Sequence, residues 1–494
     1  MSENYVIGSD RGQELLLPYA LDGYVDEDNE VRFVDAFVDT LNLNELGFTH
    51  SLHEEEGAGR PSYDPSDLLK LYLYGYLNQV RSSRKLEREC RRNTEVMWLM
   101  KKLAPDFKTI ADFRKDNVDC VKNVFKEFVF FLQDLDLFGG ELASVDGSKF
   151  KAVNATKRNF DAKKLADKLK RIEEKIERYM KELEEGDRKE EAAAAAEERA
   201  LLAKRKKYLK EKLEKLRKQT QELKAASEKL KESAGQKQIS LTDPDSRLMK
   251  NNGKFEVCYN IQASVDEKNK LIADYDATNE GEDRNQLSKM ATGTKETLGV
   301  DELEVTADRG FSNSLEIKEC VDNGITPYVP EQKEGGRYKH TGVPEPAFHN
   351  YRFVYSAEHD TYTCPAGHEM RFWKADSDAT GRVLRVYRTD ACTGCPFRSK
   401  CTNNRLGRMI RRWEHEQIME EMRERLKSEP MKVAIRKELS EHPFGTMKRA
   451  FNQGYLLLKG LRKVRGEIGL TMLAYNMRRA INILGSKALM ASLG

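Results

Sequence analysis

The stretches ASVDGSKF (residues 143–150) and VTADRGFSN (residues 305–313) decide the expected fold of this 494-residue chain. Each begins with a short β-branched or apolar run, reaches an aspartate, and meets a glycine within the next two residues. A run of this kind followed by glycine is typical of a strand that ends at a turn. We therefore expect Asp146 and Asp308 each to stand at the tip of a strand.

The segments around these aspartates follow a regular order of elements. The sequence predicts a strand ending at Asp146, strands at 255–265 and 271–277, a helix at 283–298, a strand at 303–306, a helix at 312–323 and a strand at 325–329. Three strands, helix, strand, helix, strand is the order of an α/β, ribonuclease H-like domain. In that fold the first and fourth strands are neighbours, which would bring Asp146 and Asp308 together.

A third acidic residue, Glu441, opens the basic, helix-like stretch SEHPFGTMKRAFNQGY (residues 440–455). Hard divalent cations prefer carboxylate oxygens, so Asp146, Asp308 and Glu441 together would suit two Mg²⁺ (or Mn²⁺) ions. Such a pair of ions is suited to cutting and joining a nucleic-acid backbone. The alternative, an ordinary surface acid, fits any one of the three residues taken alone, because charged side chains are mostly exposed.

The charge of the chain is unevenly distributed although its net value is only +3. Residues 1–60 hold fourteen acidic and three basic residues, whereas residues 431–494 hold three acidic and twelve basic ones. A basic block beside a candidate metal site suits a phosphate-rich partner. The candidate DNA-binding residues of this block are Arg436, Lys437, Lys448, Arg449, Arg462 and Lys463. With no membrane-length apolar run and no secretion signal, a cytoplasmic protein is expected.

Residues 61–138 show short helical patterns separated by polar turns. Ser66, Ser82 or Ser83, Thr94 and Thr109 are candidate helix caps, and the pattern is compatible with a helix-turn-helix module. Its basic residues would then meet phosphates; they are Arg81, Arg84, Arg88, Arg91, Arg92, Arg114 and Lys115. A helical cap on the catalytic domain would need the same periodicity and remains the alternative.

Residues 160–236 are rich in charge and carry two heptad patterns, one starting at Leu165 and the other at Leu209, with Gly186 and Asp187 between them. Two such seams predict an antiparallel coiled-coil hairpin. A single solvated helix, or pairing with a second chain, would fit the same pattern.

Four cysteines gather in a second insertion, residues 331–410. Cys364, Cys392, Cys395 and Cys401 are soft ligands, and the two-residue spacing in CTGC suits tetrahedral Zn²⁺. Structural zinc is the main expectation; reduced thiols or an iron–sulfur cluster are the alternatives.

The motifs VDGSKFKAVNA, TDPDSRLMKNNGKFEVCYNIQASVD, TADRGF, CTGCPFRSKC and EHPFGTMKRAFNQGYLLLKGLRKVRGEIGLTMLAYNMRRA resemble those of bacterial insertion-sequence DDE transposases with a tyrosine, arginine, glutamate, lysine signature. The resemblance spans residues 60–485 and is to those members of the family that carry a coiled insertion after the first aspartate. It implies that Asp146, Asp308 and Glu441 are the catalytic triad and that Lys448 is the signature lysine. The sequence departs from the signature at Lys437 and Ala434, where arginine and tyrosine are expected.

The resemblance further implies a nucleoid-associated enzyme that cuts the terminal inverted repeats of an element and joins the freed 3′-OH to target DNA, working as a dimer or a larger assembly. A nuclease or resolvase without strand transfer, or a non-catalytic DNA-binding descendant, would share the fold. The expected division of the chain is an acidic lead-in (1–60), a helical DNA-binding domain (61–138), a catalytic core (139–159, 237–330 and 411–485), the coiled-coil insertion (160–236), the cysteine-containing insertion (331–410) and a tail (486–494).

Overall fold

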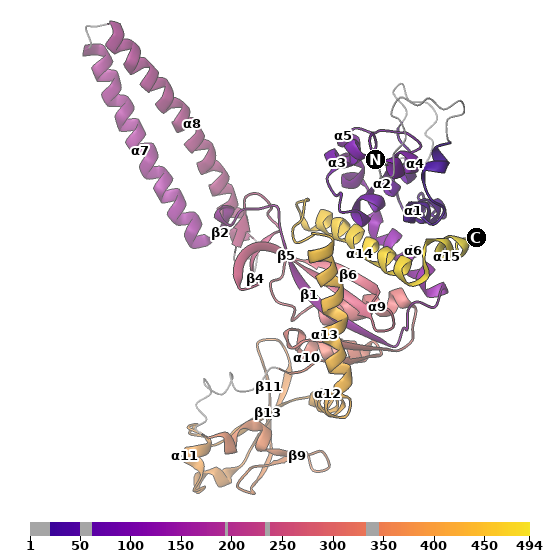
Figure 1. The fold of residues 1–494 in the computed structure, drawn as a ribbon. Coiled ribbons are helices and arrows are strands. Elements are labelled where there is room, and N and C mark those ends of the chain that lie inside the picture. Colours follow the sequence, from indigo (N-terminus) through magenta and orange to yellow (C-terminus); the bar gives the residue numbers. More distant parts are fainter. Residues whose placement is uncertain (1–19, 50–61, 193–195, 233–237, 332–344) are drawn as a thin grey trace, which may run out of the picture.

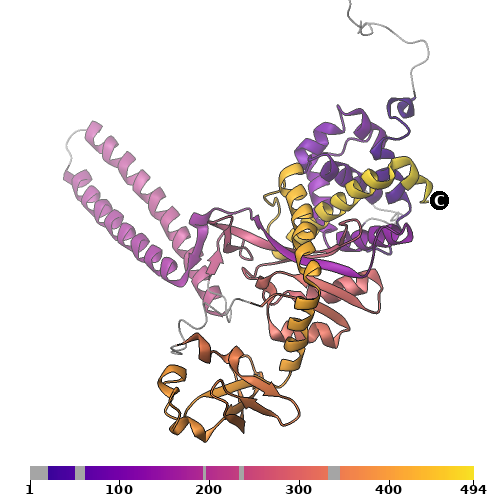
Figure 2. The ribbon, with the colours of Figure 1, turned by 60° about the horizontal axis from the view of Figure 1, so that its bottom comes forward.

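The computed structural model describes residues 20–49, 62–192, 196–232, 238–331 and 345–494. A mixed α/β body lies at the centre, and a long pair of helices and a small sheet-based unit project from it in different directions (Figures 1 and 2). None of the described helices is long and apolar enough to cross a membrane.

The central sheet has six strands in the order β4-β5-β1-β7-β8, with β6 also paired to β5. The strand β1 runs antiparallel to β5 and parallel to β7, so the two strands that carry the aspartates are neighbours, as expected. The strand bounds are β1 Leu142–Lys151, β4 Arg247–Asn251, β5 Lys254–Asp266, β6 Ile272–Thr278, β7 Leu303–Ala307 and β8 Ile325–Tyr328.

One expectation for this sheet was wrong, because Asp146 does not end its strand. The parallel pairing of β1 with β7 stops at Val145 and Ala307, but the antiparallel pairing with β5 continues to Lys151. Asp146 therefore lies in the middle of β1, at the point where its parallel neighbour ends. Asp308 follows β7 directly, as the sequence predicted.

Helices cover both faces of the sheet. The helix α13 (Pro430–Gly445) packs on the face that carries Phe150, whose ring lies 6.3 Å from that of Phe444. The helix α9 (Leu287–Leu298) packs on the other face, where Gly293 lies against Asp274 of β6. The shorter helix α10 (Ser314–Asp322) lies beside α9.

The N-terminal part of the chain is a bundle of helices joined to this body. Its helices are α1 Glu30–Asp39, α2 Pro65–Leu77, α3 Ser83–Glu89, α4 Thr94–Leu99, α5 Phe107–Asp116 and α6 Cys120–Asp134. The side-chain caps of α2, α4 and α5 are Asp64, Asn93 and Asp106, each one or more residues before the expected cap.

The acidic N-terminal segment is not a loose lead-in over the residues that the structure describes. The apolar side chains of α1, including Phe33 and Phe37, are buried in the main core, and α1 packs against α2 and the C-terminal helix α15 (Ser486–Ala491). The tail is likewise part of the body.

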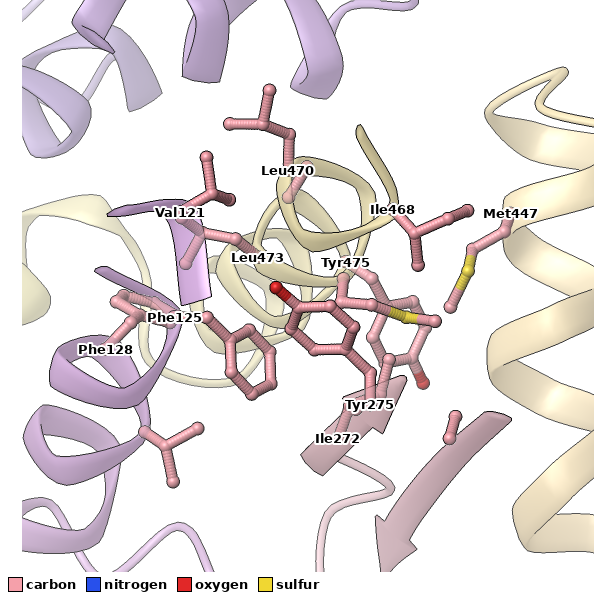
Figure 3. Close-up of a cluster of buried hydrophobic side chains, with 14 of the residues drawn as sticks. Val121, Phe125, Phe128, Ile272, Tyr275, Met447, Ile468, Leu470, Leu473 and Tyr475 are labelled. Atoms are coloured by element: carbon pink, nitrogen blue, oxygen red, sulfur yellow. The ribbon is translucent and has the colours of Figure 1, made fainter. Parts of the chain in front are cut away.

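The long helix α14 (Leu461–Leu484) joins the bundle to the sheet. Figure 3 shows Phe125 and Phe128 of α6, Tyr275 of β6 and Leu473 of α14 facing a common interior. The rings of Phe125 and Tyr275 lie edge to face at 4.9 Å. Because this core is continuous, the helical bundle is one packed unit with the sheet.

A buried charge cluster reinforces this junction. Glu467 of α14 is fully buried, accepts hydrogen bonds from the backbone of Leu457 and Leu458, and lies 3.5 Å from Arg81. Burial raises the pKa of Glu467, and the negative charge of Glu467 helps to raise the pKa of the nearby Arg114. Arg81 and Arg114 are both buried, so the expectation that they meet phosphates was wrong.

The charged insertion forms two long helices, α7 (Ala162–Ala192) and α8 (Ala196–Glu232), which run side by side in opposite directions (Figure 1). Leu165 and Leu223 are buried between them, and Arg205 of α8 pairs with Glu182 of α7 at 2.5 Å. The two seams therefore face each other within one chain. The helix α7 continues through Gly186, where the sequence predicted a break, because a single glycine weakens a helix without forcing it to end. The short strands β2 (Asn159–Asp161) and β3 (Gln238–Ser240) pair at the base of the hairpin.

The second insertion contains a five-stranded antiparallel sheet in the order β13-β12-β11-β10-β9. Its strands are β9 Val354–Ser356, β10 Thr361–Thr363, β11 Glu369–Ser377, β12 Val383–Arg388 and β13 Met409–Trp413. Because β13 belongs to this sheet, the insertion extends to Trp413, three residues past the expected boundary. The helix α12 (Glu416–Ser428) then leads back to α13.

Candidate functional site

The two aspartates project from the same face of the central sheet. Val145 and Ala307 are partners in the parallel pairing, so the residues that follow them, Asp146 and Asp308, lie next to each other. Gly147 donates its backbone N–H to Asp146 Oδ1 at 2.8 Å, and Gly310 donates to Asp308 Oδ1 at 2.6 Å. Local backbone donors therefore orient each carboxylate.

Asp146 is the more enclosed of the two carboxylates. Burial raises its pKa, and the nearby charge of Asp308 adds to that rise, while the Gly147 N–H, the Ser440 hydroxyl and Arg436 oppose it. The negative charges of two neighbouring carboxylates repel each other, and a divalent cation bound between them would relieve that repulsion.

The helix α13 faces this pair of aspartates with residues spaced four apart. Arg436 Nη1 lies 4.0 Å from Asp146 Oδ2, and the buried Ser440 hydroxyl, which donates to the Arg436 carbonyl at 3.0 Å, lies near enough to the same carboxylate to lower its pKa. Residues separated by four lie on one side of a helix, so Phe444, one turn further, contacts Phe150 of β1.

Glu441 lies one residue beyond this contacting row, and its side chain is 67% exposed. Lys437 is its ion-pair partner at 3.9 Å. No hydrogen bond or ion pair joins Glu441 to Asp146 or Asp308 among the described residues. The structure thus brings two of the three predicted carboxylates together and leaves the third on the adjacent side of α13.

Lys448, which the resemblance implies is the signature lysine, lies beside the two aspartates. Lys448 belongs to a π-helical turn, η9 (Thr446–Ala450), that continues α13. Its Nζ donates to Ser148 Oγ at 2.6 Å and lies 4.9 Å from the ring centre of Phe150. Ser148 shares the face of Asp146, so the cation stands two residues along β1 from the first aspartate. Burial lowers the pKa of Lys448.

Sequence reasoning did not single out Asp283, which lies against β1 from the α9 side. Its carboxylate accepts hydrogen bonds from Asn260, Gln262 and Lys149. A side chain at Gly147 would collide with Asp283 and would lie 2.5 Å from Gln262 Nε2. The sequence places Asp283 at the start of a predicted helix, and no local pattern in it signals this contact.

The other predicted DNA-binding residues divide into two groups. Arg84, Arg88 and Arg449 are exposed; Arg84 also lies over the ring of Phe107. Arg462 forms an ion pair with Asp119, so part of its charge is already balanced. Lys463 is half-buried on α14.

The four cysteines of the second insertion surround one small cavity together with His368. Cys401 is buried, the other three thiols are half-buried, and all four are free. Burial raises the pKa of Cys401, and the neighbouring thiols add to the effect. The fold of β10 to β13 therefore collects the four soft ligands that the sequence singled out.

Across the described ranges, no three His, Cys, Asp or Glu side chains form a group that could hold a metal ion. At the carboxylate site the missing member is Glu441, which is exposed and paired with Lys437. The donor chemistry fits nonetheless, because the paired oxygens of Asp146 and Asp308 suit Mg²⁺ and four thiols around one cavity suit Zn²⁺.

Comparison with known families gives two matches. A model described as a transposase DDE domain matches residues 363–481, which include Glu441, Lys448 and the four cysteines. A model described as a transposase domain (DUF772) matches residues 19–116, most of the N-terminal helical bundle. A search of curated proteins found no match. One solved structure, the cryo-EM structure of a piggyBac transposase synaptic complex with hairpin DNA, has a TM-score of 0.28 and 10% identity over 95% of this chain and 80% of that chain.

Both family models describe transposases, and they match separate parts of the chain at its two ends. Together the two matches indicate a transposase. They indicate a member of the DDE transposases of insertion sequences.

Proposed function

We propose that this chain cuts the ends of an insertion sequence and joins the freed 3′-OH to target DNA at a single catalytic centre. The observation that carries the proposal is the placement of Asp146 and Asp308 side by side on adjacent parallel strands, with Arg436 and Lys448 reaching the same face. This is the arrangement expected of a ribonuclease H-like catalytic core, formed here by residues 139–159, 237–330 and 414–485.

In this proposal Asp146, Asp308 and Glu441 would hold two Mg²⁺ ions, which would supply activation of the attacking oxygen and stabilisation of the departing one. Glu441 is exposed and held only by a surface ion pair of modest strength. A rotation of its side chain about χ1 and χ2 would change its direction at little cost.

The cationic residues around the aspartates would handle the phosphate. Arg436 can donate two parallel N–H groups to two non-bridging oxygens of a phosphate, which a lysine cannot do. It therefore takes the part that the signature arginine plays, in place of Lys437. Lys448, placed two residues along β1, would contact the neighbouring phosphate, and Arg449 would add charge to the same backbone.

The remaining parts would serve binding and assembly. The exposed Arg84 and Arg88 of α3 would contact DNA phosphates, and the four thiols would bind structural Zn²⁺ that stabilises the second insertion. Excision requires both element ends in one complex, so a dimer or larger assembly follows from the reaction itself.

The test uses the full-length chain with labelled duplexes that carry the element's own ends, identified in the DNA flanking the coding region. Cleavage and strand-transfer products are measured with Mg²⁺ for the wild type and for Asp146→Asn, Asp308→Asn and Glu441→Gln. Each substitution is expected to reduce both products by about 10²-fold or more while DNA binding persists.

Glu438→Gln is the matched control on the same helix, because Glu438 is 65% exposed and pairs with Lys270 instead. If Glu438→Gln abolished cleavage and Glu441→Gln did not, the third carboxylate would be reassigned. Cleavage without strand transfer would identify a nuclease, and DNA binding without either product would identify a non-catalytic descendant.

A further inference from the structure

The hairpin between β4 and β5 carries an unusually exposed aromatic side chain at its tip. Phe255 is 66% exposed, and no aromatic ring or cation stacks on it within the described chain. The hairpin turns at Asn252 and Gly253, whose φ angles of 48° and 81° match a two-residue type I′ turn. The turn sets the register of the two strands, so Phe255 is paired with Lys250 at the tip.

Phe255 lies on the same face of the sheet as the catalytic Asp146. Asp146 is paired with Ala263 of β5, and cross-strand partners share a face. Side chains alternate along a strand, so every second residue from Ala263 back to Phe255 returns to that face. The pairing of β5 is regular over this stretch, with β1 from Ala263 to Cys258 and with β4 from Cys258 to Lys254. Eight residues at about 3.3 Å each place Phe255 roughly 26 Å from the catalytic position.

Cations lie along this path and around the tip. Lys448 contacts Ser148 on the catalytic face, and Lys250 is the cross-strand partner of Phe255. Lys250 is exposed on the face of Phe255, and Lys254, the residue before Phe255, is exposed at the tip on the opposite face. Lys151 is half-exposed and pairs with Glu256 at 3.3 Å, the one acidic group at the tip among the described residues.

Resting on the proposed function, we propose that the hairpin tip, residues 250–255, binds the double-stranded DNA that extends from the catalytic centre toward the hairpin, passing over α13, which covers the intervening part of this face. Its lysines contact phosphates, and the ring of Phe255 packs against base pairs in the minor groove. A duplex rises about 3.4 Å per base pair, so the contact falls about eight base pairs from the scissile phosphate. Apolar wedges flanked by cations are a known way for proteins to grip and bend a duplex.

The experiment compares full-length wild type with Phe255→Ala on two sets of end duplexes. In the long set the duplex extends about twelve base pairs beyond the scissile phosphate, and in the short set it stops after about five, truncated from each side in turn. Affinity is measured by fluorescence anisotropy at one fixed salt concentration. The matched control is Leu201→Ala, because Leu201 is 72% exposed and lies on the remote hairpin helix α8.

Phe255→Ala is expected to weaken binding of the long duplex by about 5- to 100-fold, the range for loss of one aromatic contact with bases. The difference from wild type should vanish on the short duplex, and 2-aminopurine placed about eight base pairs from the cut should brighten with wild type alone. Leu201→Ala should bind both duplexes as wild type does. Unchanged melting temperature would show that Phe255→Ala is folded.

Equal affinity of wild type and Phe255→Ala for the long duplex, truncated on either side, would overturn the proposal. A change of oligomeric state in Phe255→Ala with unchanged affinity would also overturn it and would assign the tip to a second copy of the chain. Both results leave the catalytic assignment intact, since that assignment depends on the cleavage defect of Asp146→Asn.

Discussion

The guanidinium group of Arg436 lies 4.0 Å from the carboxylate of Asp146, across the interface between α13 and the central sheet. Both side chains are 23% exposed, so the pair is shielded but reachable by a substrate. Lys437, the residue that follows Arg436, is 72% exposed and pairs with Glu441. Consecutive residues of the helix point in different directions, so Arg436 lies beside Asp146 while Lys437 lies at the surface.

Replacing Arg436 should impair cleavage far more than replacing Lys437. Arg436→Ala removes the donor beside Asp146, and we expect DNA cleavage to fall about 10²-fold. Arg436→Lys should recover part of the rate, because lysine keeps the charge but not the two-pronged geometry. Lys437→Ala should change the rate less than about threefold, since exposed ion pairs contribute little. Initial rates on a labelled element end measure all three; the reverse order would assign the signature arginine to position 437.

Gly147 is needed because Asp283 and Gln262 fill the space where a side chain would stand. Gly147→Ala should destabilise the protein by about 1–3 kcal/mol, the usual cost of overpacking, and should slow cleavage because the adjacent Asp146 is displaced. The matched control is Gly186→Ala, since no atom lies within 4 Å of the added methyl group. That change in α7 should stabilise the chain by about 1 kcal/mol. Chemical denaturation measures both values, and a neutral Gly147→Ala would contradict the packing described.

The half-buried His442 should make stability depend on pH. Burial lowers its pKa below the ordinary value of 6.5, and the charges of Arg479 and Lys270 add to this. The unfolded chain then binds more protons below pH 6.5 than the folded chain does, so this residue's contribution to stability is present above 6.5 and lost as the pH falls through the folded pKa. His442→Gln removes that dependence.

The melting temperature of metal-free protein, measured between about pH 7.5 and about pH 5.5, tests this. The difference between wild type and His442→Gln should shrink as the pH falls. His359→Gln, in an exposed turn of the second insertion, is the control and should follow the wild type. A constant difference for His442→Gln would contradict the prediction.

The cysteine cavity predicts bound zinc. Purified protein should contain about one zinc ion per chain, and Cys392→Ser should lower that content and the melting temperature together. Cys90→Ser is the control, because Cys90 is buried in the N-terminal bundle outside the cavity. Elemental analysis with and without a chelator measures the metal. Full zinc content in Cys392→Ser would remove that thiol from the ligand set.

Much of the central sheet could be predicted from the sequence, because alternating apolar residues and glycine punctuation act locally. The strands β5, β6, β7 and β8 and the helices α9 and α10 lie close to their expected positions. The strand β4 was missed: its five residues, RLMKN, lack the alternation that marks a half-buried strand. The end of β1 was predicted too early because a glycine at position 147 is typical of a turn. In the structure, the position has no room for a side chain because the carboxylate of Asp283 packs against it.

The sequence by itself determined which chemical groups this protein brings to its two candidate sites. These groups are two aspartates on neighbouring strands with a cationic helix at one site, and four clustered thiols at the other. Only the tertiary structure decided that Arg436 rather than Lys437 faces Asp146, that Arg81 and Arg114 are buried against Glu467, and that the two long helices pair within one chain. The physical reason is that periodicity shows which side of an element faces an apolar surface, while the partner that covers that side is set by the packing of the whole chain and, for Asp146 and Glu467, comes from residues hundreds of positions away.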